Sequence, residues 1–161
     1  ISMKKIISSI LLLGTIMTGC SSDGGDSTAF TSSIDIDGEQ FIPSEITAYP
    51  DNQSFENATV FVLGSNSSSP QNQHIMVVKV IYPLSQEDAS GTYLINGIQG
   101  TGNYTRFTDS YLLYNGSVTV EDLGNNRYTL TFNSVKGNQG NGSTEVITVS
   151  GTISGKFLES N

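Results

Sequence analysis

The segment Glu145–Phe157, EVITVSGTISGKF, decides the fold class of this chain because it alternates over its whole length. Its apolar side chains recur with a period of two and share one face of a strand: Ile147, Val149, Ile153 and Phe157. Polar side chains fill the other face: Thr148, Ser150, Thr152, Ser154 and Lys156. Gly151 and Gly155 lie on the apolar face, where we expect a close backbone approach, a bulge or a bend. The pattern predicts a long strand that is paired through Phe157, with only residues 158–161 loose.

The stretch before this segment continues the same alternation. Val118 and Val120 share one face of a strand over 117–123, and a turn at 124–126 follows. Residues 127–132 then place Tyr128, Leu130 and Phe132 inward. Two alternating runs joined by a Gly-Asn-Asn turn predict a β-hairpin.

Further strands are predicted towards the N-terminus. Residues 34–42 hold an Asp-Gly pair that supplies the positive φ angles of a tight hairpin. Residues 44–49 lie between two prolines and predict an edge strand or irregular chain. The remaining predicted strands are 58–63, 90–96 and 74–82, of which the last is apolar on both faces, as a central strand is.

These elements predict an all-β domain over residues 34–161. Every connection is short and no segment offers a helical crossover, so the sheet is expected to be antiparallel. About 8–10 strands in one domain form either a β-sandwich or a curled barrel. Both architectures remain open from the sequence alone.

The composition restricts the partners of the chain. Its 161 residues include 15 acidic and seven basic ones, for a formal charge of −8. Nucleic-acid binding needs basic patches that contact phosphates, so this balance argues against a nucleic-acid partner. It also argues against a domain that lies flat on anionic lipid.

The N-terminus has the pattern of a secretory signal over residues 1–19. Lys4 and Lys5 follow Met3, the expected start, and an apolar run over 6–17 is too short to span a membrane. It ends in Met17-Thr18-Gly19-Cys20. Residues 20–33 are polar and rich in Gly and Ser, which predicts a flexible tether after the signal-peptide helix. An ordinary signal peptide with a chance cysteine is the alternative.

Small residues before a lone cysteine, after a charged and an apolar segment, resemble the lipobox of bacterial lipoproteins. The resemblance implies that Cys20 receives a diacylglyceryl group, that the chain is cut before it, and that the lipid anchors the protein in a membrane. The body, with SGTY at 90–93, GSVTVEDLGNNRYTLTF at 116–132 and VITVSGTISGKF at 146–157, resembles small β-rich lipoproteins of Bacteroidota. That likeness implies a location at the bacterial outer membrane, on the periplasmic face or the cell surface, and supplies no catalytic residues.

The aromatic stretch 104–114 supplies the candidate ligand-binding residues. Tyr104, Phe107, Tyr111 and Tyr114 form either a well-packed strand pair or an aromatic binding face. An exposed, coplanar set would favour a glycan or an envelope protein as ligand. Burial of the tyrosines would favour a structural role.

The remaining polar residues do not form a recognised chemical motif. Asp35, Asp37 and Glu39 alternate, but a calcium loop needs a longer ligand series, and His74 is the one histidine of the chain. The sequence therefore predicts no metal site and no cofactor.

Catalysis is also not indicated. The chain has no G-x-S-x-G elbow, and its adjacent acids, Glu87-Asp88 and Glu121-Asp122, point to opposite faces of a strand. We therefore expect a non-catalytic structural or accessory lipoprotein. The alternatives are a surface glycan- or protein-binding module and, in second place, a hydrolase.

Overall fold

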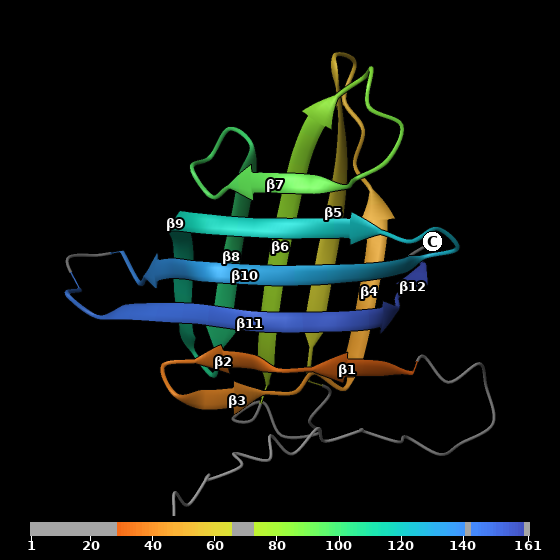
Figure 1. The fold of residues 1–161 in the computed structure, drawn as a ribbon. Helices are drawn as coiled ribbons and strands as arrows, with labels where there is room; N and C mark the ends of the chain where they lie inside the picture. Colours follow the sequence, from red (N-terminus) through yellow and green to blue (C-terminus); the bar gives the residue numbers. More distant parts are fainter. Residues whose placement is uncertain (1–28, 66–72, 141–142, 160–161) are drawn as a thin grey trace, which may run out of the picture.

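A computed structural model describes residues 29–65, 73–140 and 143–159 of the chain, and these fold into β-strands alone. The strands run in the following order (Figure 1): β1 Phe30–Ser32, β2 Ile34–Ile36, β3 Glu39–Phe41, β4 Glu45–Pro50, β5 Glu56–Gly64, β6 His74–Pro83, β7 Gly91–Leu94, β8 Gly100–Arg106, β9 Asp109–Asp122, β10 Arg127–Asn138, β11 Val146–Lys156 and β12 Leu158–Glu159. The all-β class predicted from the sequence is confirmed.

The strands form one 12-stranded, mostly antiparallel sheet that curls into a half-barrel. Its order is β12-β4-β5-β6-β8-β9-β10-β11-β2-β3, with β1 on β11 and β7 on β9. In Figure 1 the strands β4, β5, β6 and β8 stand upright behind β7, β9, β10 and β11, which cross in front of them. The curled alternative is therefore the observed one. The strand count exceeds the predicted 8–10 because segments as short as β12 show no alternation in sequence.

The long strands β9 and β10 bend together where they pass from one layer to the other. Gly116 of β9 has a φ of 90°, and Ser134 of β10 has a φ of 50° within a break of register after Asn133. A Cβ atom on Gly116 would lie 2.6 Å from the carbonyl oxygen of Ser134, so only glycine fits there. Before the bend β9 pairs with β8, and after it with β7. The bulge thus curls the sheet around its core.

Strand β11 has the register that its alternation predicts. Ile147, Val149, Ile153 and Phe157 are all buried. Its two glycines are points of close approach, since a Cβ atom on Gly151 would lie 2.2 Å from the oxygen of Ser33 and one on Gly155 would lie 2.5 Å from the Cβ of Phe30. These gaps admit β1, so the sheet already includes Phe30–Ser32, ahead of the predicted start near Ile34. The last residues of the predicted tether, 30–32, are a strand.

The C-terminal end is more ordered than its sequence suggests. The Phe157 amide donates a hydrogen bond of 2.7 Å to the Asn126 carbonyl, which confirms pairing through that residue. The prediction that residues 158 and 159 are loose is wrong, because Leu158 and Glu159 pair in parallel with Thr47 and Ala48 of β4. A two-residue strand beside an edge strand brings the end of the chain back to the upright layer.

Strand β6 occupies the middle of the upright layer, with β5 and β8 on its two sides. Met76, Val78 and Val80 are buried on its inner face. On its outer face Ile75 is exposed and Val77 and Ile81 are half-buried. The predicted central position is confirmed, while only one face of the strand lies in the core.

The predicted signal segment 1–19, Cys20 and the tether up to residue 28 lie outside the described residues. Within the described part of the chain, no helix has the length and apolarity that a membrane crossing requires.

Candidate functional site

The four predicted ligand-binding aromatics divide into two pairs. Tyr104 and Tyr111 face each other across β8 and β9, with ring centroids 6.1 Å apart and a tilt of 29° between the rings. They are 2% and 0% exposed and belong to the hydrophobic core. Phe107 and Tyr114 are 46% and 42% exposed. The set is therefore not one coplanar binding face.

Phe107 projects from the tight turn that joins β8 to β9. Its φ is 58°, a left-handed conformation that an aromatic residue rarely adopts. Its ring meets the imidazole of His74 edge-on, with centroids 5.4 Å apart. Tyr114 lies further along β9, on the outward side of the strand. Phe107 is thus the one exposed member of the set that adjoins a polar cluster.

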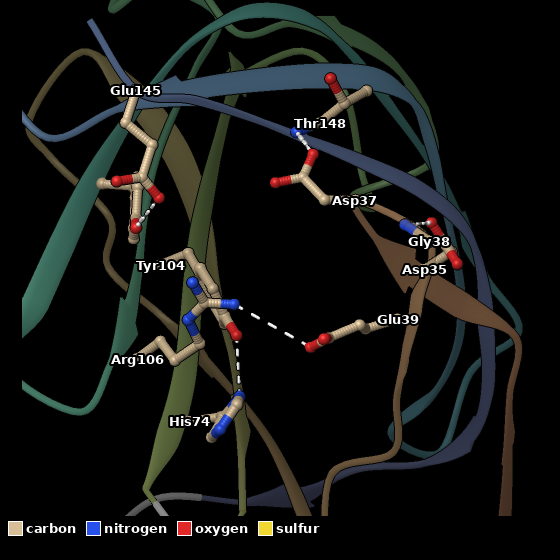
Figure 2. A network of polar contacts seen from close by, with 10 residues as sticks. Asp35, Asp37, Gly38, Glu39, His74, Tyr104, Arg106, Glu145 and Thr148 are labelled. Atoms are coloured by element: carbon tan, nitrogen blue, oxygen red, sulfur yellow. Dashed lines mark hydrogen bonds and ion pairs between the residues drawn. The ribbon is translucent and has the colours of Figure 1, made fainter. Parts of the chain in front are cut away.

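This polar cluster lies at one end of the half-barrel and surrounds a cavity of about 220 Å³. Strand β3 contributes Glu39 and Phe41 to the walls, β6 contributes His74, and β8 contributes Tyr104 and Arg106. His74 and Arg106 are direct partners in the β6–β8 register, which places both at the same edge of the sheet. Figure 2 shows Arg106 and Glu39 facing each other across this opening, with His74 beside Tyr104.

His74 is held on several sides. Its Nδ1 lies 2.8 Å from the Tyr104 hydroxyl, in a hydrogen bond whose donor depends on the imidazole tautomer. The Phe41 ring stacks on it with centroids 6.3 Å apart. Burial lowers the pKa of His74, the Arg106 charge lowers it further, and Glu39 opposes them. Burial also raises the pKa of Tyr104 to about 12, so its hydroxyl keeps its proton. The pair is neutral and hydrogen-bonded near pH 7.

Arg106 is the cation of this end. One of its terminal nitrogens lies 4.0 Å from a Glu39 oxygen, and the Glu39 side chain is 80% exposed. Its Nε atom is buried and has no hydrogen-bond partner among the described residues. A loose ion pair in water contributes little to stability. Any hydrogen bond from Arg106 to a molecule in the cavity would therefore come from its terminal nitrogens and not from the buried Nε.

Three nearby carboxylates accept hydrogen bonds from other residues of the domain. Asp35 accepts a 2.7 Å hydrogen bond from the Gly38 amide, and Asp37 accepts one of 2.8 Å from the Thr148 amide. Glu145 accepts a 2.7 Å hydrogen bond from the Tyr111 hydroxyl. In the described ranges, no three His, Cys, Asp or Glu side chains are grouped as a metal site would require. The Asp35, Asp37 and Glu39 alternation belongs to a hairpin whose turn residues, Asp37 and Gly38, both have positive φ.

Sequence reasoning located the aromatics but missed the partners that His74 and Arg106 make. The sequence places His74 at the first residue of a predicted strand, and the structure places it against Tyr104, 30 residues away. Only the β6–β8 register reveals that proximity, because the chain runs through β7 before β8 returns to pair with β6.

Comparison with protein families, with curated proteins and with solved structures finds no match to this chain.

Proposed function

We propose that this chain is a lipoprotein of the bacterial outer membrane, anchored through Cys20, whose β domain has a non-catalytic structural or accessory role. The anchor is supported by the order of charged segment, apolar segment and lone cysteine in the sequence. Two or more acyl chains, each worth about 0.8 kcal/mol per buried CH₂, hold a protein stably at a bilayer.

The observation that carries the structural role is the use of Tyr104 and Tyr111. Both rings lie in the core, and their hydroxyls bond to His74 and Glu145 rather than standing free towards a ligand. An imidazole packed between Phe41 and Phe107, bonded to a tyrosine and shifted towards its neutral form, is arranged as a structural group.

The Cys20→Ser variant tests the anchor. A serine hydroxyl cannot replace the thiol that is alkylated, so we expect an uncleaved or soluble precursor that takes up no label from radioactive palmitate. The Ser22→Ala variant, two residues away, should be labelled as the unchanged protein is. Wild-type labelling of the Cys20→Ser variant would exclude the proposed anchor.

A surface binding module is the second candidate, and the cavity beside Phe107 favours it. Arg106, Glu39 and the Gln40 amide line this cavity, and the exposed Phe107 ring packs against its His74 wall, so polar contacts and a stacking surface are both offered to a sugar. The Phe107→Ala variant should then lose retention on an immobilised polysaccharide that retains the unchanged chain. Leu112→Ala removes an exposed apolar side chain elsewhere and should leave retention intact. If no immobilised polysaccharide in a panel of bacterial and host glycans retains the unchanged protein, the proposal of a glycan ligand is wrong.

A further inference from the structure

A second, larger cavity lies at the opposite end of the half-barrel and encloses about 440 Å³. Its lining residues come from the ends of β4, β6 and β9, the start of β10 and the short β12. This volume lies within the range of about 300–1,000 Å³ that small-molecule sites occupy. The cavity at the His74 end is half as large.

Three tyrosine rings, Tyr49, Tyr82 and Tyr128, line this cavity. Tyr128 is fixed by edge-on packing against Phe61 and Phe157, with centroids 5.1 and 5.5 Å apart. The Tyr82 hydroxyl lies 3.1 Å from the Thr59 hydroxyl, in hydrogen-bonding contact. Rings held in this way need no ordering when a ligand arrives, which lowers the cost of binding.

The same walls carry four carboxylates, on Glu87, Asp88, Asp122 and Glu159, and none of the described lining residues is a lysine or an arginine. The hydrogen bonds that these carboxylates accept come from neutral donors. The Gly124 amide, for example, donates to Asp122 over 2.9 Å. Two ion pairs join described residues, Lys79 with Asp51 and Arg106 with Glu39, and neither includes an acid of this cavity.

The field inside the cavity is consequently negative. Burial raises the pKa of Tyr128, and Asp122, Tyr82 and Glu159 raise it further. A negative potential around aromatic faces repels carboxylates and phosphates. It attracts a cation through two interactions: a charge–charge interaction with the carboxylates and a cation–π interaction with the negative face of the ring.

We propose that this cavity binds an alkylammonium group, as found on a polyamine, an amino sugar or a lysine side chain. The carboxylate oxygens accept hydrogen bonds from the ammonium N–H groups, and charge-assisted bonds of this kind are the stronger class. The tyrosine rings pack against the adjoining methylenes and contribute cation–π attraction. The proposal does not depend on the lipid anchor or on the cavity at the other end of β6.

Calorimetric titration of the full-length chain in detergent tests this with cadaverine, 1,5-diaminopentane, as the probe. We expect saturable one-to-one binding of cadaverine and none of 1,5-pentanediol, which has the same length without charge. Ring signals of Tyr82 and Tyr128 should shift in NMR spectra during the cadaverine titration. Equal binding of the diol, or no heat and no shift with cadaverine, would overturn the proposal.

Paired variants separate this cavity from the general acidity of the chain. Glu87→Gln with Asp122→Asn removes two cavity charges, keeps both side-chain shapes and leaves an oxygen for the Gly124 amide. It should weaken cadaverine binding by about tenfold or more, which corresponds to about 1.4 kcal/mol. The control, Glu45→Gln with Glu121→Gln, removes two exposed charges outside the cavity and should change the affinity by less than about twofold. Equal weakening by both pairs would show that diffuse surface charge binds the amine, and would refute the site.

Discussion

The two ends of β6 use polar residues in opposite ways. His74 begins the strand and Tyr82 lies eight residues later, about 26 Å away at the rise of an extended strand. At the His74 end the tyrosine, the imidazole and the nearby acids bond to one another or to backbone amides. At the Tyr82 end four carboxylates line a cavity whose described walls hold no cation. At the first end His74 and most of the acids are bonded within the fold, with the buried Nε of Arg106 as the exception. At the second end the carboxylates accept hydrogen bonds only from neutral donors, and no described wall residue balances their charge.

The difference follows from what closes each end. At the first end the turn between β2 and β3 places Asp35 and Asp37 against backbone amides, and the β6–β8 register places His74 near Tyr104. At the second end the chain returns as β12, and Phe157 packs against Phe61 and against Tyr128, whose ring lines the cavity. The packed rings of Phe61, Tyr128 and Phe157 stabilise the second end without neutralising its carboxylates.

The largest effect on stability is expected from removing the ring of Phe157. Phe157 is 1% exposed, so Phe157→Ala should leave a cavity and lower the free energy of unfolding by about 3 kcal/mol or more. Lys156→Ala, on the exposed face one residue earlier, should cost less than about 0.5 kcal/mol. Denaturant unfolding of both variants measures the difference. Equal or reversed costs would mean that β11 is slipped by one residue.

A smaller effect is expected at the other end. Tyr104→Phe keeps the ring in the core and removes the hydroxyl that bonds to His74, which should cost about 1 kcal/mol of unfolding free energy. Tyr114→Phe removes a hydroxyl from a 42% exposed ring and is the matched control, with less than about 0.5 kcal/mol expected. If the two variants unfold alike in urea, the hydrogen bond of the first end contributes nothing to stability.

No effect is expected from chelation. Asp35 and Asp37 accept hydrogen bonds from backbone amides of their own hairpin and of β11, so these two carboxylates are bonded without an ion. Thermal unfolding with and without EDTA should give the same midpoint. A large drop on addition of EDTA would show that a metal stabilises the acidic segments.

The sequence predicts those parts of the fold that repeat a local pattern. The alternation of Ile147, Val149, Ile153 and Phe157 sets the register of β11, and Asp37-Gly38 sets the first hairpin. It does not predict β1 or β12, because two or three residues carry no period. Their places depend on partners far along the chain, Gly155 and Thr47.

The candidate sites are harder to predict from the sequence than the strands are. Nothing in the sequence distinguishes the environments of Tyr104 and Phe107, yet Tyr104 lies in the core and Phe107 is exposed at a turn. The second cavity joins Tyr49, Glu87 and Glu159, which are distant in the chain and share no motif. Only the curl of the sheet brings them together.

The most direct test of the contrast between the two ends is the titration of His74, the one histidine of the chain, by NMR. Burial and the Arg106 charge lower its pKa below the usual 6.5, so its midpoint should lie under that value. The unfolded chain then binds the proton first, and unfolding free energy should fall as the pH drops below 6.5. Arg106→Gln should move the midpoint upward. A midpoint at or above 6.5 in the unchanged protein would contradict the neutral, hydrogen-bonded pair of His74 and Tyr104 described for this end.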